Sequence, residues 1–152
     1  MGNTMEHISK IFEAIEYANK ANVLMPSLPL EMKPVYIRIL NAFYKIRDDN
    51  GTACISDISK TSGILLPNTT KLINELVSIN VVEKLFSTVD KRVVLVKATE
   101  KGERYIQEYI HDLHQKLEKE LSTIPESEVE LLYKTMQKVY YITKKVYQSG
   151  CE

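Results

Sequence analysis

Segment 55–98 constrains the fold most, because its apolar spacing changes from helical to alternating part-way along. ISDISKTSGI predicts a short helix, with Ser56 as a candidate cap and Gly63 as a turn residue, and LPNTTKLINELVSIN predicts a second helix with Pro67 near its start. Two runs rich in β-branched residues, VVEKLFST and RVVLVKAT, follow and are joined by a short polar stretch. Helix, glycine turn, helix and hairpin in this order predict a winged helix-turn-helix.

Apolar residues also recur at helical spacing on both sides of this segment. These four stripes span 8–21, 35–46, 106–121 and 129–147. Pro34 and Pro125 suit first helical positions, and Thr99 is the expected N-cap of the third of these helices. The sequence therefore predicts a mostly α protein with a small β-hairpin wing (α+β), a winged helix-turn-helix with long N- and C-terminal dimerisation helices.

Length and charge indicate the domain organisation and the kind of partner that the chain can bind. A chain of 152 residues is long enough for one domain, and we expect a single domain over 1–152, with dimerisation helices in 1–47 and 103–152 and the winged helix-turn-helix lobe in 52–102. Lys+Arg and Asp+Glu are 20 each, so any basic patch has to be local. No apolar run could span a bilayer and no signal peptide is visible, which predicts a cytoplasmic protein with no membrane partner.

The stretch 90–102, DKRVVLVKATEKG, resembles the wing-to-helix pattern of the MarR family of bacterial transcriptional regulators, which is Asp-x-Arg, an apolar strand and Thr-x-x-Gly. The upstream stretch 55–84 is similar to the family's helix-turn-helix in length and in the placing of Ile58, Gly63, Ile64, Leu72 and Leu76. The resemblance covers nearly the whole chain. Two positions depart from it, since Asn80 and Ala98 stand where the family commonly has Gly and Leu.

The resemblance implies a sequence-specific transcriptional regulator that binds double-stranded DNA as a homodimer on a palindromic operator. It also implies control by a small aromatic or phenolic effector, which shifts the population between DNA-competent and incompetent spacings of the two lobes. A repressor is the implied role, although the residues do not distinguish repression from activation. The alternative is a winged-helix protein–protein interaction module that has lost DNA binding.

The candidate DNA contacts lie on the second helix and in the wing. Asn side chains can bond adenine edges and Lys can reach guanine or phosphate, whereas an arginine suits a narrow minor groove. Asp90 is expected to pair with Arg92 and hold its direction, and Thr61 and Ser62 to shape the turn. An ordinary polar helix face and a solvated hairpin tip are the alternatives. The predicted set is Pro67, Asn68, Thr70, Lys71, Asn74, Asp90, Lys91 and Arg92.

The nine tyrosines raise the question of a ligand pocket. Most of them share helical stripes with Ile, Leu and Val, so packing in a core or a dimer interface is one reading. The resemblance to the MarR family implies the other, an effector pocket between the early helices, the DNA-binding lobe and the long third helix. Its candidate lining residues are Tyr17, Tyr36, Phe43 and Tyr109.

The remaining reactive residue types form no recognisable site. Cys54 falls in a predicted buried strand and is interpreted as packed and inert, while Cys151 lies near the C-terminus. The histidines lack the spacing of a metal site. No glycine-rich phosphate loop, GxSxG or HExxH is present, so we expect neither an enzyme nor a cofactor.

Overall fold

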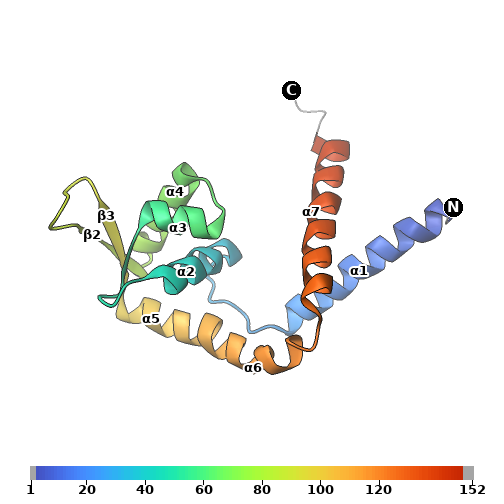
Figure 1. Cartoon of the computed structure of the whole chain (residues 1–152), viewed down its shortest axis with the longest axis horizontal. Helices are drawn as coiled ribbons and strands as arrows, with labels where there is room; N and C mark the ends of the chain where they lie inside the picture. The colour runs from blue at the N-terminus through green and yellow to red at the C-terminus, as the bar shows by residue number, and fades with distance from the viewer. Residues whose placement is uncertain (1–2, 149–152) are drawn as a thin grey trace. The chain divides into compact units, whose positions relative to one another are not determined.

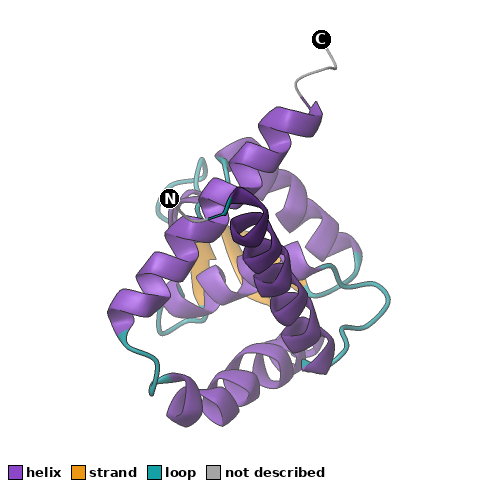
Figure 2. Cartoon of the chain, turned by 90° about the vertical axis from the view of Figure 1, so that its right-hand side faces the viewer, coloured by secondary structure: helices purple, strands orange, loops and turns teal. Residues whose placement is uncertain are grey.

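The computed structural model describes residues 3–148 and divides into two compact units, Met1–Asp112 and Leu113–Glu152 (Figure 1). In chain order the elements are α1 (Thr4–Leu24), α2 (Pro34–Ile46), β1 (Thr52–Cys54), α3 (Ile55–Ser62), α4 (Leu66–Ser78), β2 (Val82–Phe86), β3 (Val94–Ala98), α5 (Glu100–Ile106), the π-helical segment η1 (Gln107–His111), α6 (Asp112–Leu121) and α7 (Glu126–Gln148). Helices dominate beside one small sheet (Figure 2), and the predicted fold class is confirmed. Cys151 lies outside the described residues.

The predicted helix starts are largely confirmed. Pro34 is the first residue of α2, where a missing N–H costs nothing, and Pro67 is the second residue of α4. Pro125 is one residue short of the predicted first helical position, because α7 begins at Glu126, and its carbonyl accepts the N–H of Glu128 at 2.9 Å. The expectation that Ser56 caps α3 is wrong, because α3 begins at Ile55, one residue before it.

A three-stranded antiparallel sheet carries the wing. Its order is β1-β3-β2, and the β2–β3 hairpin pairs Val82 with Ala98 and Phe86 with Val94. Cys54 ends β1 as expected but is only half-buried, because it lies where the sheet edge meets α3. Its thiol donates to Asp57 Oδ2 at 3.0 Å, so it has a polar partner.

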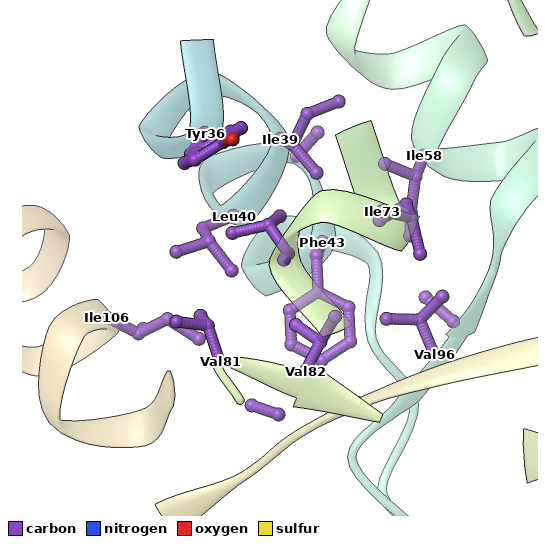
Figure 3. Close-up of a cluster of buried hydrophobic side chains, with 14 of the residues drawn as sticks. Tyr36, Ile39, Leu40, Phe43, Ile58, Ile73, Val81, Val82, Val96 and Ile106 are labelled. Carbon is purple, nitrogen blue, oxygen red and sulfur yellow. The ribbon is translucent and has the colours of Figure 1, made fainter. Parts of the chain in front are cut away.

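A single hydrophobic core is formed by side chains from α2, α3, α4, the sheet, α5 and η1. Figure 3 shows side chains from these elements pointing toward one another, with Phe43 of α2 near the centre. Each fully buried aliphatic or aromatic side chain contributes roughly 1.5–3 kcal/mol relative to exposure. The largest fully buried apolar side chains are Ile39, Leu40, Phe43, Ile58, Ile73, Leu76, Val81, Val82, Val96, Ile106 and Ile110.

The Thr-x-x-Gly pattern has a direct structural cause. Thr99 caps α5, as predicted, because its Oγ1 accepts the N–H of Gly102 at 3.0 Å, and its hydroxyl donates to the carbonyl of Asn80 at 2.6 Å. A Cβ at Gly102 would lie 2.0 Å from the carbonyl oxygen of Val81, so only glycine fits. Asn80 has φ +61°, a left-handed conformation that glycine adopts freely and that asparagine tolerates better than most other residues.

The loop before α2 is tied to α5 by a small polar cluster. Glu31 Oε1 accepts hydrogen bonds from Lys101 Nζ and from the Tyr105 hydroxyl, both at 2.6 Å. Lys101, and to a lesser degree Tyr105, hold the pKa of Glu31 below its usual range. The hydrogen bond to Glu31, followed by burial, raises the pKa of Tyr105 to about 12. Lys101 Nζ also donates to the Ile79 carbonyl at 3.0 Å, which links the cluster to the end of α4.

The first and last helices contribute no side chain to this core, and neither α1 nor α7 has a buried residue. Both nevertheless carry large apolar side chains in water, which one isolated chain leaves uncovered. The largest such exposures on α7 are those of Leu131, Leu132, Tyr133, Tyr141, Ile142, Val146 and Tyr147.

Candidate DNA-binding surface

The turn between α3 and α4 is fixed by hydrogen bonds from three directions. Gly63 ends α3 at φ +71° and donates its N–H to the Ser59 carbonyl at 3.0 Å. The Ser59 hydroxyl crosses the turn to the Ile64 carbonyl at 2.6 Å. Arg38 of α2 donates from Nε to the Ser62 carbonyl at 2.9 Å, so the turn is also anchored to the core helix. These contacts set the direction in which α4 leaves the turn.

One side of α4 is buried and holds the helix against the core. Thr69, Ile73 and Leu76 are each 0% exposed, at the spacing expected of one helix face. The Thr69 hydroxyl donates to the Ile64 carbonyl at 3.0 Å, which satisfies the buried polar group. Tyr36 of α2 donates to Glu75 Oε2 at 2.8 Å, and burial together with this carboxylate raises the pKa of Tyr36.

The opposite side of α4 presents most of the residues predicted to read DNA. Exposed there are Pro67, Asn68, Lys71 and Asn74. Thr70 departs from the expectation, since it is only half-exposed and its hydroxyl donates to the Leu66 carbonyl at 3.0 Å. The first turns of α4 therefore show water an amide, an ammonium group and no carboxylate, as a helix for the major groove requires.

The wing loop connects β2 and β3 (Figure 1), and short-range hydrogen bonds order it. The Ser87 N–H donates to the Val93 carbonyl at 3.1 Å, and the Val93 N–H donates to the Asp90 carbonyl at 3.0 Å. Asp90 Oδ1 accepts the Arg92 backbone N–H at 3.0 Å and its Nε at 3.2 Å, so the predicted Asp90–Arg92 pair is confirmed. The Arg92 side chain remains 92% exposed, and Lys91 beside it is exposed too.

Lys84 belongs to the same surface, although the sequence patterns did not single it out. It lies in β2, and its Nζ donates to Oδ1 of Asn74 on α4. The wing strand and the outward face of α4 are thus joined by a side-chain contact. A lysine two residues after Val82, on the same face of the strand, is the available signal, but its partner cannot be identified without the packing of α4 on the sheet.

Comparison with known proteins supports this reading of the fold. No family model matches the sequence. A curated relative, the uncharacterised HTH-type transcriptional regulator YfiV of Bacillus subtilis (strain 168), is 27% identical over 106 residues, which are 70% of this chain. The matched residues span 64% of that relative's own length.

Several solved structures match over nearly the full chain. Streptococcus pneumoniae FabT, solved in complex with DNA, is 21% identical with a TM-score of 0.58, over 94% of this chain and 96% of its own. The adhesin competence repressor AdcR of Streptococcus pyogenes is 18% identical with a TM-score of 0.59, over 94% and 99%. Both are MarR-family regulators. The chain has the MarR fold. Bordetella bronchiseptica BpsR, whose DNA binding is regulated by 6-hydroxynicotinic acid, is 16% identical with a TM-score of 0.55, over 91% and 99%.

Within this MarR fold, the four candidate effector residues are not all brought together. Tyr36 and Phe43 lie in the core of α2, 4% and 1% exposed. Tyr109 is half-buried in η1, with its ring edge-on to Tyr105 and the centroids 5.8 Å apart. Tyr17 is 71% exposed on α1. Two of the four are therefore packing residues, and the other two keep accessible ring surface.

Residues 3–148 contain neither a cluster of metal-ligand residues nor a membrane-spanning helix. Nowhere in that range do three or more His, Cys, Asp or Glu side chains gather as a metal ion requires. No helix in the same range has the length and apolarity to cross a membrane.

Proposed function

We propose that this chain is a sequence-specific DNA-binding transcriptional regulator that acts as a homodimer on a palindromic operator. One observation carries the proposal: α4 and the wing each present DNA-compatible groups to solvent. The turn before α4 is anchored to the core, and the exposed face of α4 lacks carboxylates in its first turns. The ordered wing exposes Arg92 to solvent. A helix in the major groove can read base edges, and an arginine in the flanking minor groove can recognise the width of that groove. The similarity in fold to FabT, solved in complex with DNA, supports this assignment.

The homodimer is supported by the uncovered apolar faces of α1 and α7. Val23, Leu24 and Tyr147 are each more than four-fifths exposed, which is unusual for a lone soluble chain. We infer that the terminal helices of two copies cover one another across a two-fold axis. Such a dimer would place its two α4 helices roughly 34–36 Å apart, one turn of B-DNA.

A fluorescence-anisotropy titration tests the DNA-binding proposal. Purified protein would be titrated into labelled duplexes drawn from a randomised palindromic library, at two salt concentrations. We expect selective binding that weakens steeply with salt, because released counterions drive phosphate contacts. A chain that binds no selected duplex at low salt would refute the proposal.

Sedimentation velocity tests the dimer separately. We expect one species of twice the chain mass at micromolar concentration, and removal of residues 139–152 should abolish the dimer or its solubility. A stable full-length monomer at that concentration would contradict the proposal. Since DNA is absent from this experiment, its outcome does not depend on the operator.

We also infer control by a small aromatic or phenolic effector. BpsR provides the precedent in this fold, since 6-hydroxynicotinic acid regulates its DNA binding. In this chain Tyr109 and Tyr17 are the candidates with accessible rings, and Tyr109 is the better placed because η1 adjoins the core of the DNA-binding lobe. Release of bound DNA by a hydroxybenzoate, lost in Tyr109→Ala and kept in Arg104→Ala, a change at an exposed residue of α5, would support the assignment. Equal release from both variants would remove Tyr109 from it.

A further inference from the structure

The contact between Lys84 and Asn74 has a chemical consequence for DNA reading. Lys84 pairs with Val96 in the hairpin register, and its neighbour Glu83 pairs with Lys97. Because side chains alternate across a strand, Lys84 shares the face of the buried Val96, whereas Lys97 points to the opposite face. The half-buried Lys84 stem thus runs beneath α4, and its ammonium group emerges at Asn74.

The chemistry of lysine fixes which way the Asn74 amide is turned. An ammonium group has three donors and no acceptor, so only the amide oxygen of Asn74 can face it. The contact takes one of the two lone pairs of that oxygen and sets a cation beside it, which disfavours the approach of a further donor, and the amide NH₂ points away from Lys84. Together the two side chains present N–H donors to whatever lies against α4. A free asparagine would present one acceptor and two donors instead.

Base edges in the major groove distinguish these two states. Guanine shows two neighbouring acceptors, N7 and O6, whereas adenine shows the acceptor N7 beside the donor N6–H₂. An asparagine reads adenine with both its oxygen and its NH₂ group, so an ammonium group bound to the oxygen weakens half of that pattern by repelling the N6–H₂ donor. Thymine offers the single acceptor O4 and cytosine a donor. A donor-only pair therefore matches guanine best.

We propose that Lys84 is a positioning residue that makes Asn74 a reader of guanine rather than adenine. The proposal rests on the proposed function, since it concerns the base preference of α4 on DNA. It changes the expectation drawn from the asparagine alone, which favours adenine. It also assigns to a wing strand a part in base reading, beside the wing's own contact with the flanking groove.

The experiment begins with selection of duplexes from a randomised library by the wild-type protein and by Asn74→Ala. The base pair whose preference disappears in Asn74→Ala is the one that Asn74 reads. Anisotropy then compares two duplexes that differ only there, with guanine or adenine. We expect the wild type to prefer guanine about tenfold, within the range of one bidentate contact.

Three lysine variants separate positioning from simple charge. Lys84→Met keeps an apolar stem of similar length but cannot donate, so the tenfold preference should disappear or turn toward adenine. Lys84→Arg still donates and should keep guanine. Lys97→Met removes the same charge from the opposite face of the sheet and should leave the ratio of the two affinities unchanged. A Lys84→Met protein that binds both duplexes more weakly by the same factor, with an unchanged ratio, would show a phosphate contact only and overturn the proposal.

An NMR spectrum of the DNA-free protein tests the Lys84–Asn74 contact separately from the proposed DNA binding. The side-chain amide resonances of Asn74 should shift in Lys84→Met and remain in place in Lys97→Met. Failure of the wild type to select any duplex would overturn the proposed function and the guanine assignment with it, while these resonances would still report whether Lys84 holds Asn74. A wild type that binds DNA but shows no shift on Lys84→Met would overturn the guanine assignment alone.

Discussion

Replacement of Arg92 by alanine tests the wing without disturbing the fold. The side chain is 92% exposed and forms an ion pair with Asp90 on the same loop. Exposed ion pairs contribute little to stability, so the melting temperature should stay close to that of the wild type. Any loss of DNA affinity would therefore come from the contact itself. Because arginine is planar and weakly hydrated, lysine would not substitute for it fully in a narrow groove.

The size of the effect follows from the two wings of the proposed dimer. Each neutralised phosphate contributes about 0.9 to the slope of log K against log salt. Two lost wing contacts would reduce that slope by about 1.8. Between 50 and 200 mM salt, a fourfold change, the ratio of wild-type to Arg92→Ala affinity should shrink by about twelvefold. The variant is thus most impaired at low salt.

The assay is anisotropy at three salt concentrations on a selected palindrome and on a scrambled duplex of equal length. Arg92→Ala should lose affinity for both, because a wing contact to the backbone or to groove width carries little base information. Arg104→Ala removes an exposed charge on α5 and serves as the control. Equal affinity and equal slope for Arg92→Ala and wild type would show that the wing is only a solvated hairpin.

Three further predictions concern base reading, packing and pH. Lys71→Ala should change the preference among half-site sequences by roughly 1–3 kcal/mol, measured by competition between duplexes. Gly102→Ala should lower the free energy of unfolding in urea by about 1–3 kcal/mol, because its Cβ would meet the Val81 carbonyl oxygen at 2.0 Å, although helix propensity alone would favour alanine by about 1 kcal/mol. Tyr105 should ionise near pH 12, as followed by its ring carbon resonances, and Glu31→Gln should lower that pKa. Because the pKa of Tyr105 is higher in the folded protein than in the unfolded chain, its hydrogen bond to Glu31 stabilises the fold below pH 10. That stabilisation is lost as the pH rises through about 12.

The parts of the fold that the sequence predicts are those encoded over a few neighbouring residues. The helical stripes, the glycine turn and the Thr99 cap each depend on contacts within about four positions, and the structure confirms them. The start of α3 does not follow from the sequence, because its cap has no side-chain hydrogen bond that a pattern could reveal. The π-helical segment η1 does not follow from it either, since Ile106 and Ile110 keep the spacing of a regular helix through it.

The candidate site divides in the same way. The helical period alone places Lys71 and Asn68 on the exposed side of α4. Because side chains alternate along β2, Lys84 lies on the inward face with Val82. A charge is unusual there, so the sequence already indicates that Lys84 needs a polar partner. That the partner is Asn74, ten residues earlier on another element, depends on how α4 packs over the sheet. Local periods therefore decide which α4 side chains can reach DNA, while the packing of α4 on β2 decides which hydrogen-bonding group Asn74 presents.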